Sequence, residues 1–265
     1  MKSIVNIRAS SLSTLFDCPK RWAAFAIFGK TMATSSKGVL GQAIHTSTGI
    51  YDQSILAGDG ITIDEAAGAA VDFIKCESKK TIWDDESPQE AEKIAISLHK
   101  KYCTLIAPKQ SYKAVEVTCN DLVIKDLGLR LTGTTDRIRE SDNGYGIVDL
   151  KSGKQAVGTN GVPQTKGHAY QQGVYELIAE FGSGMKIEAP AQIIGMNTAK
   201  TDAGQRIGSA EIEGCRQLLL GDENNVGVLQ HASNLIHSGN FYGNPKSMMC
   251  HKNYCPEYQS CNYRK

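Results

Sequence analysis

Residues 133–154, GTTDRIRESDNGYGIVDLKSGK, hold the pattern on which the fold depends. Apolar runs on either side of the polar, glycine-containing segment 141–146 predict two strands joined by a hairpin. Side chains alternate along a strand, so Asp149 and Lys151 lie on one side of the second strand. Asp136, on the first strand, can reach that same side. The stretch therefore predicts two carboxylates and one ammonium group at one place.

These three groups fit a metal-dependent hydrolytic site. Carboxylate oxygens are the ligands that Mg²⁺ and Mn²⁺ prefer, and a neighbouring lysine can hold or polarise an attacking water molecule. A surface hairpin with an incidental ion pair produces the same D-x-K pattern, and for an isolated D-x-K that is the commoner explanation. The remainder of the chain decides between the two interpretations.

Length and composition indicate a globular protein. The 265 residues, 41% of them hydrophobic and 22% charged, suit one large domain or a domain with an insertion. The sequence has no apolar run of membrane-spanning length, and residues 1–11 lack the apolar core of a signal peptide. We therefore expect a soluble cytoplasmic protein. In that compartment eight cysteines indicate metal ligands or reactive thiols before disulfides.

The net charge of +1 conceals an uneven distribution. Residues 1–38 carry +5, residues 240–265 carry +3, and the middle of the chain carries −7. If the two ends meet in the fold, they form a basic region that attracts a polyanion such as nucleic acid. If they do not meet, the charges are scattered solvated lysines and arginines.

Hydrophobic periodicity predicts alternating helical and strand regions. Helices are expected over residues 10–29 (interrupted at Pro19), 37–56, 64–80, 88–106, 167–181 and 210–238 (interrupted near 221–225). Strands are expected over 112–124, 127–139, 145–150 and 189–197, with a further partner near 204–208. This order predicts an α/β (α+β) fold with a mixed sheet of about four or five strands flanked by helices. Residues 62–107 read as a helical insertion or cap over a site.

Three cysteines lie close together near the end of the chain. Cys250, Cys255 and Cys261 form a C-x4-C-x5-C pattern, which leaves a four-coordinate site one ligand short. Cys18 is the candidate for the fourth ligand because it precedes a proline, as Cys255 does. The other candidates are His251, Cys76, Cys103, Cys119 and Cys215. Four thiolates suit a [4Fe–4S] cluster or Zn²⁺, and the wide spacing favours iron–sulfur.

An ordered set of motifs accompanies these residues. The set comprises an S-x-L-x-x-F-x-x-C-P-x-R-W-like opening (Ser10, Leu12, Leu15, Cys18, Pro19, Arg21, Trp22), Gly41 with His45, residues 133–136 and 148–153, Gln171 with Tyr175, and the cysteine tail. In this order the chain resembles the RecB-like branch of the PD-(D/E)XK nuclease superfamily. It is most similar to the iron–sulfur members, the AddB nuclease domain and the CRISPR-associated adaptation exonucleases. It departs from them in the C-x4-C spacing, where these relatives more often have C-x2-C, and in residues 62–107, which match no motif.

The resemblance implies a restriction-endonuclease-like core in one domain over residues 1–265, with the tail 240–265 tied to Cys18. It implies that Mg²⁺ or Mn²⁺ is held by His45, Asp136, Asp149 and the Leu150 carbonyl. Lys151 would then orient or activate the water, Gln171 would brace the site and Tyr175 would lie near the DNA strand. The further DNA contacts expected are Arg137, Lys20 and Arg21, and Glu116 matches an acidic position on the first strand. A [4Fe–4S] cluster, with zinc as the alternative, is expected on Cys18, Cys250, Cys255 and Cys261.

The expected function is metal-dependent hydrolysis of DNA phosphodiester bonds by an exonuclease. Its substrate is expected to have a free end or to be single-stranded, in phage recombination, DNA repair or CRISPR spacer acquisition within a bacterial, archaeal or phage-infected cell. The sequence contains no helicase motif, so unwinding needs a helicase or another recombination or CRISPR protein. The main alternative is a catalytically inactive iron–sulfur or zinc DNA-binding module. The others are a thiol- or metal-dependent enzyme unrelated to nucleic acid and a structural zinc domain, which leaves the D-x-K hairpin unexplained.

Overall fold

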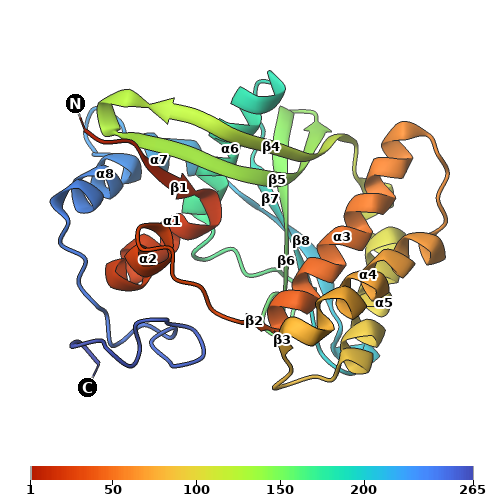
Figure 1. Ribbon diagram of the computed structural model, residues 1–265. Helices are drawn as coiled ribbons and strands as arrows, with labels where there is room; N and C mark the ends of the chain where they lie inside the picture. Colours follow the sequence, from red (N-terminus) through yellow and green to blue (C-terminus); the bar gives the residue numbers. More distant parts are fainter. Residues whose placement is uncertain (1, 265) are drawn as a thin grey trace.

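A mixed six-stranded sheet organises the computed structural model, within the described residues 2–264 (Figure 1). Its strands are β1 (Val5–Arg8), β4 (Tyr112–Ile124), β5 (Leu129–Ser141), β6 (Gly144–Gly153), β7 (Ala191–Asn197) and β8 (Ile207–Ile212). The strand order is β1-β5-β6-β7-β8, and β4 pairs with β5. A separate small sheet pairs β2 (Thr34–Ser35) with β3 (Thr81–Ile82).

Two different strands, β1 and β6, pair with successive parts of the same edge of β5. Since β4 pairs with β5 along most of its length, β1 and β6 must share the opposite edge. There β1 runs parallel to Leu129–Thr132, whereas β6 runs antiparallel to Arg137–Ser141. Between them, residues 133–136 of β5 face the point where β1 and β6 part. Asp136 therefore lies at an opening in the sheet.

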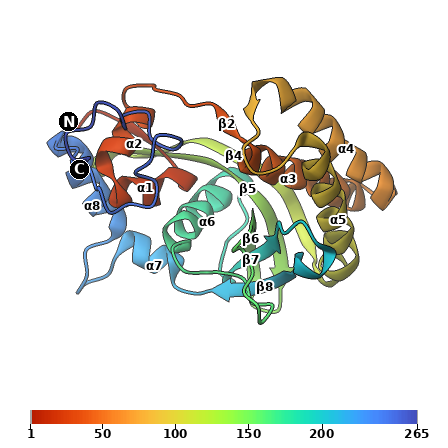
Figure 2. The same cartoon turned by 90° about the horizontal axis from the view of Figure 1, so that it is seen from below.

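Helices cover both faces of this sheet (Figure 2). One hydrophobic core is formed with α1 (Leu12–Asp17), α2 (Pro19–Ala26), α6 (Ala169–Ser183), α7 (Cys215–Leu220) and α8 (Val228–Ser238). The second core is formed with α3 (Ser36–Ala57), α4 (Ile63–Glu77) and α5 (Pro88–Leu105). Along β6, Ile147 packs in the first core, and Val148 and Leu150 pack in the second. Short 3₁₀ turns complete the elements, at Ala9–Ser11, Ser78–Lys80, Ala107–Lys109, Lys125–Leu127 and Asp202–Gly204.

Local sequence explains where the helices of the second layer begin and end. Thr62 with Glu65 and Ser87 with Glu90 form complete capping boxes at the starts of α4 and α5. The long helix α3 ends at Gly58, whose φ of 76° is a conformation that glycine adopts without steric cost. Residues 62–107 thus form a helical layer over one face of the sheet, packed against α3, which carries His45.

The mixed α/β architecture predicted from the sequence is confirmed, with two differences in its elements. The sheet has six strands in the described residues, because β1 joins it without having been expected. The expected helix from residue 210 is wrong at its start, since Ala210 and Ile212 lie in β8 and pair with β7. Cross-strand packing on a buried neighbour overrides the weak local preference there. The interruption expected at Pro19 is confirmed, since the helical region 10–29 contains two helices and Pro19 begins the second.

The two basic ends of the chain meet. Residues 242–264 form turns that pack beside α1 and α2, with the tail near α2 in both views (Figures 1 and 2). The Asn244 amide donates to the Asp17 carbonyl at 2.8 Å, and Arg21 Nε donates to the Tyr254 carbonyl at 2.9 Å. The condition for a combined basic region is therefore fulfilled. Over the described part of the chain, no helix has the length and apolar character needed to cross a membrane.

Candidate active site

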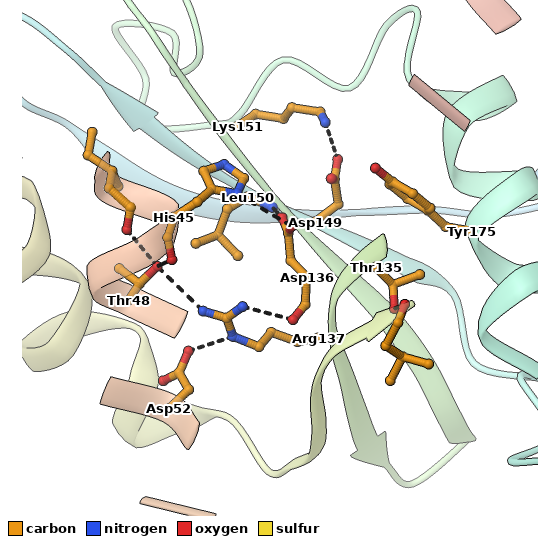
Figure 3. A network of polar contacts seen from close by, with 12 residues as sticks. His45, Thr48, Asp52, Thr135, Asp136, Arg137, Asp149, Leu150, Lys151 and Tyr175 are labelled. Atoms are coloured by element: carbon orange, nitrogen blue, oxygen red, sulfur yellow. Dashed lines mark hydrogen bonds and ion pairs between the residues drawn. The ribbon is translucent and has the colours of Figure 1, made fainter. Parts of the chain in front are cut away.

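Three elements bring the expected catalytic side chains together beside the opening in the sheet (Figure 3). α3 contributes His45, β5 contributes Asp136, and β6 contributes Asp149 and Lys151. The His45 Nδ1 lies 3.4 Å from Asp136 Oδ1, and the Lys151 Nζ lies 2.6 Å from Asp149 Oδ2. The Leu150 backbone N–H donates to Asp136 Oδ2 at 2.7 Å and links the two strands. Residues separated by about a hundred positions thus form one site.

Asp149 is held by an amide that the sequence did not single out. Gln172 on α6 donates from Nε2 to Asp149 Oδ2 at 2.8 Å, and both residues are buried. Gln171, expected to brace the site, donates instead to the Tyr175 hydroxyl at 2.9 Å. The available signal was the helical spacing: Gln172 lies three residues before Tyr175 and seven before Ala179, on the buried face of α6.

The pKa values of Asp136 and Asp149 are shifted in opposite directions. Burial raises the pKa of Asp149; Lys151 opposes this shift, and the charge of Asp136 adds to it. Burial also disfavours ionised Asp136, but the neighbouring His45 outweighs it and lowers the Asp136 pKa to about 2. Burial disfavours charged His45 as well, yet Asp136 raises the imidazole pKa overall. One buried and one partly exposed carboxylate beside an imidazole and an ammonium group form a donor set that suits a hard divalent cation.

Arg137 lies behind the site, which corrects its expected contact with DNA. The side chain is 1% exposed, and its Nε donates to Asp52 Oδ2 at 2.7 Å. Its Nη1 donates to the Asp136 carbonyl at 2.8 Å, and its Nη2 donates to Thr48 Oγ1 at 3.4 Å. Since Thr48 and Asp52 belong to α3, the buried guanidinium joins the helix of His45 to the strand of Asp136. The prediction that Arg137 contacts DNA is therefore wrong.

Glu116 lies on β4 between Val115 and Val117, which pair with Arg137 and Thr135, and its backbone is unusual. Its φ is 55°, a conformation that costs a non-glycine residue about 1–3 kcal/mol. Its carboxylate lies against α3, where a Cβ on Gly49 would come within 3.1 Å of Glu116 Oε1. Backbone strain of this kind occurs preferentially at functional sites. The functional role expected for Glu116 stays a prediction.

The remaining expected DNA contacts lie around the same region. Tyr175 is mostly buried, and burial raises its pKa, with Asp149 and Asp136 adding to the shift. Lys20 lies 5.9 Å from the ring centroid of Tyr263, and the Arg21 guanidinium lies 5.5 Å from that of Phe25. DNA binding by Tyr175, Lys20 and Arg21 stays a prediction.

The four cysteines expected to act together line one small pocket. Cys18, Cys250, Cys255 and Cys261 all border it, and the Asn244 backbone N–H donates to Cys18 Sγ at 3.4 Å. The alternative candidates are placed elsewhere: Cys119 and Cys215 in the first core, Cys103 in the second, and Cys76 and His251 exposed. Among residues 2–264, no group of three or more His, Cys, Asp or Glu side chains is already arranged to hold a metal ion.

The model of the PD-(D/E)XK nuclease superfamily matches residues 7–264, from β1 to the cysteine tail. Among curated proteins, none matches the chain. The matched region includes the mixed sheet, both carboxylates and the lysine two positions after the second. The chain belongs to the PD-(D/E)XK nuclease superfamily.

Proposed function

We propose that this protein is a metal-dependent deoxyribonuclease of the RecB-like type that acts as an exonuclease. Family membership indicates a nuclease, and nucleases of this superfamily typically use Mg²⁺ or Mn²⁺. The observation that carries the proposal is the meeting of His45, Asp136, Asp149 and Lys151 at the opening in the sheet. A surface hairpin with an incidental ion pair does not require a buried Asp149 or an imidazole from a distant helix.

The ligands proposed for the cation are the imidazole of His45, the carboxylates of Asp136 and Asp149, and the Leu150 carbonyl. When bound, a divalent cation neutralises phosphate oxygens and lowers the pKa of a water molecule. The hydrogen bonds from the Leu150 N–H and from Gln172 orient the two carboxylates, and the donor groups would still have to move together to enclose a cation.

Lys151 is the residue proposed to act on the reacting groups. Its side chain is 24% exposed, whereas its partner Asp149 is 2% exposed, so the ammonium group lies on the solvent side of the pair. From there it can orient the attacking water and stabilise the negative charge that develops on the phosphate. Tyr175 borders the same carboxylates and is proposed to contact the DNA strand.

The test is cleavage by Asp136→Ala and Lys151→Ala in Mg²⁺ or Mn²⁺. Each variant is expected to lose activity by about 10²–10⁴-fold or more, because a group acting on the reacting atoms contributes on that scale. Lys154→Ala is the matched control, since Lys154 is half exposed on the same segment and pairs with Asp85 and Glu86. Linear DNA labelled at the 5′ or 3′ end, beside a closed circle, separates exonuclease from endonuclease action. Wild-type rates in Asp136→Ala or Lys151→Ala would refute the assignment.

We further propose that Cys18, Cys250, Cys255 and Cys261 hold a [4Fe–4S] cluster, with Zn²⁺ as the alternative. Support comes from their shared pocket, from the all-thiol composition of the set and from the N–H donated to Cys18 Sγ. A cluster there ties α1 to the tail. A helicase or another recombination or CRISPR protein as partner, and a place in phage recombination, DNA repair or spacer acquisition, also stay proposals.

A further inference from the structure

A cavity of about 690 Å³ lies between α2 and the β1–β5 part of the sheet. Its polar and aromatic lining includes Asn6, Arg8, Arg21, Phe25, Asn120 and Thr134. None of the residues described as lining it is an aspartate or glutamate, although the chain carries 28 of them. The cavity is therefore suited to an anionic or neutral ligand and not to a cation.

The floor of the cavity leads along β5 to the catalytic carboxylates. Thr132, Gly133 and Thr134 border the cavity, and Asp136 follows two residues later on the same strand. Two residues of a strand span about 7 Å. That distance can be bridged by neighbouring nucleotides of one DNA strand.

A second connection runs through Tyr175. Gly133 allows that ring to come close, because a Cβ on Gly133 would lie 3.3 Å from Tyr175 Cε1. The charge of Arg8 acts on the Tyr175 hydroxyl, and so do the charges of Asp136 and Asp149. Tyr175 thus lies close both to Gly133, which borders the cavity, and to Asp149, beside which Figure 3 draws it.

The lining offers the groups that a single nucleotide uses. Arg8 is exposed, and no carboxylate of the described chain forms an ion pair with it, so its guanidinium is available to a phosphate. Phe25 is half-buried and supported by the Arg21 guanidinium, which makes it a ring on which a base can stack. The amides of Asn6 and Asn120 can both donate to and accept from the edge of a base. The cavity volume lies in the range of pockets that hold small organic ligands.

We propose that this cavity binds one unpaired nucleotide of the DNA strand, next to the scissile phosphate, with its base on Phe25 and its phosphate on Arg8. The proposal rests on the proposed nuclease function and defines its substrate as a single strand or an unpaired end. A base within a duplex is stacked on both sides and paired at its edge, so it cannot occupy the cavity without being extruded.

The first test uses anisotropy to measure binding of a fluorescent single-stranded oligonucleotide in Ca²⁺. All proteins in this test carry Asp136→Asn, which prevents cleavage, and the protein with that substitution alone is called the parent. Phe25→Ala is expected to weaken binding by about 5- to 150-fold, the range for loss of one base–aromatic stack. Phe25→Tyr keeps the ring and is expected to bind like the parent. The matched control is Phe28→Ala, because Phe28 follows α2, is 65% exposed and does not line the cavity.

Arg8→Gln tests the phosphate contact separately. Loss of one phosphate contact is expected to weaken binding. It is also expected to lower the slope of log Kd against log salt concentration by about one unit or slightly less. Lys186→Gln is the control, since Lys186 is exposed, pairs with Glu188 and does not line the cavity. Blunt duplex DNA is expected to bind equally well to Phe25→Ala and to its parent.

A series of oligonucleotides with one abasic site identifies the nucleotide. In the parent, one position along the strand is expected to weaken binding as much as Phe25→Ala does. In Phe25→Ala, the same abasic site is expected to have no further effect, because the stack is already absent. Thermal unfolding of each variant shows that the fold is retained.

The proposal would be overturned if Phe25→Ala and the parent bound single strands with equal affinity. It would also be overturned if Phe25→Ala weakened binding of blunt duplex DNA as much as binding of single strands. Either result would leave the nuclease assignment standing, because cleavage depends on Asp136 and Lys151. Conversely, a protein that binds as described without cleaving DNA would refute the nuclease function and retain the nucleotide site.

Discussion

Arg137 shows how a buried residue away from the reacting groups shapes the active site. It joins α3 to β5 through Asp52 and through the carbonyl of Asp136, and Tyr102 donates to the same Asp52 carboxylate at 2.6 Å. Both members of the Arg137–Asp52 ion pair are about 2% exposed. If one member is removed, water cannot take its place beside the other. The relative position of His45 and Asp136 therefore depends on this pair.

Arg137→Met is expected to destabilise the fold by about 3–5 kcal/mol, because it leaves the Asp52 carboxylate buried without its cation. Urea unfolding measures the change. Asp52→Asn with Arg137→Met is expected to be more stable than Arg137→Met alone. Lys113→Met removes an exposed pair with Glu140 and is expected to leave stability nearly unchanged, because solvent screens such pairs. Equal stability of the single and double variants would contradict the pairing argument.

Glu176 on α6 makes stability depend on pH. Burial raises its pKa from 4.5 to about 7, and Arg216, whose Nε lies 3.9 Å away, only partly opposes the shift. The folded protein favours the neutral carboxylic acid. Its contribution to stability is therefore complete below pH 4.5 and is lost as the pH rises through about 7.

Glu176→Gln, which is neutral at every pH, is expected to gain stability relative to wild type between pH 5 and pH 8. The gain is at most about 3 kcal/mol for a shift of this size. Urea unfolding of both proteins at the two pH values measures it. Glu223→Gln, at an exposed position, is expected to show no such gain. A constant difference between Glu176→Gln and wild type would mean that Glu176 does not titrate in this range.

At the residue scale, the sequence predicted side chains that a local pattern places and missed those that a distant partner places. Asp149 and Lys151 share one strand, so alternation alone puts them on one side. The burial of Arg137 depends on Asp52, 85 positions away, and the choice of Gln172 over Gln171 depends on how α6 is rotated against β6. Neither partner is visible in the local pattern.

At the scale of the elements, α6 and α7 lie close together, and a single glycine in α6 makes this close contact possible. A Cβ on Gly173 of α6 would lie 2.5 Å from the carbonyl oxygen of Cys215, which begins α7. A backbone atom cannot move aside as a flexible side chain can. α7 can occupy its place only while residue 173 lacks a side chain.

Gly173→Ala is expected to destabilise the protein by about 1–3 kcal/mol, the usual cost of overpacking, although alanine favours helix more than glycine. Gly68→Ala is the matched control in α4, since no atom lies within 4 Å of its added Cβ. It is expected to stabilise the protein by about 0.5–1 kcal/mol. Thermal unfolding of the two variants measures shifts of opposite sign. Shifts of the same sign would show that helix propensity, and not the α6–α7 contact, controls position 173.

Elements with strong local patterns were predicted well. β4 has the predicted bounds because apolar and polar residues alternate through its middle, from Val115 to Asn120, and α4 and α5 begin within one residue of their predicted starts because of their capping boxes. β1 has only four residues and depends on a parallel partner at Leu129–Thr132. A strand that short carries too little periodicity to be recognised without its partner.

Across the whole molecule, the tail and α1–α2 act as one unit. The tail forms no helix or strand in its described part and is held by contacts such as Asn244 with Asp17 and Arg21 with Tyr254. A thiol-bound cluster would add covalent links at Cys18 and at the three tail cysteines. Without it, this segment relies on a few hydrogen bonds and ion pairs.

Anaerobically purified protein is expected to be brown and to contain iron and sulfide, as thiolate-ligated iron–sulfur centres do. Cys261→Ser is expected to lose colour and iron, whereas Cys76→Ser, at an exposed position on α4, keeps both. Removal of iron is expected to speed tryptic cleavage at Lys246 and Lys252, because the tail is then held less firmly. Colourless protein with stoichiometric zinc would refute the cluster and leave the four-thiol site standing.

The parallel pairing of β1 with β5 also has a consequence for biosynthesis. Val5 lies beside Leu129, so the ribosome must add 124 residues before the first strand can find its neighbour. At the typical rate of about 5–20 residues per second, that interval is roughly 6–25 s. During this time β1 is an unpaired, partly apolar strand that a chaperone could shield. The opening that positions Asp136 exists only after this delayed docking, so a nascent chain that has not yet closed its sheet lacks the assembled candidate site.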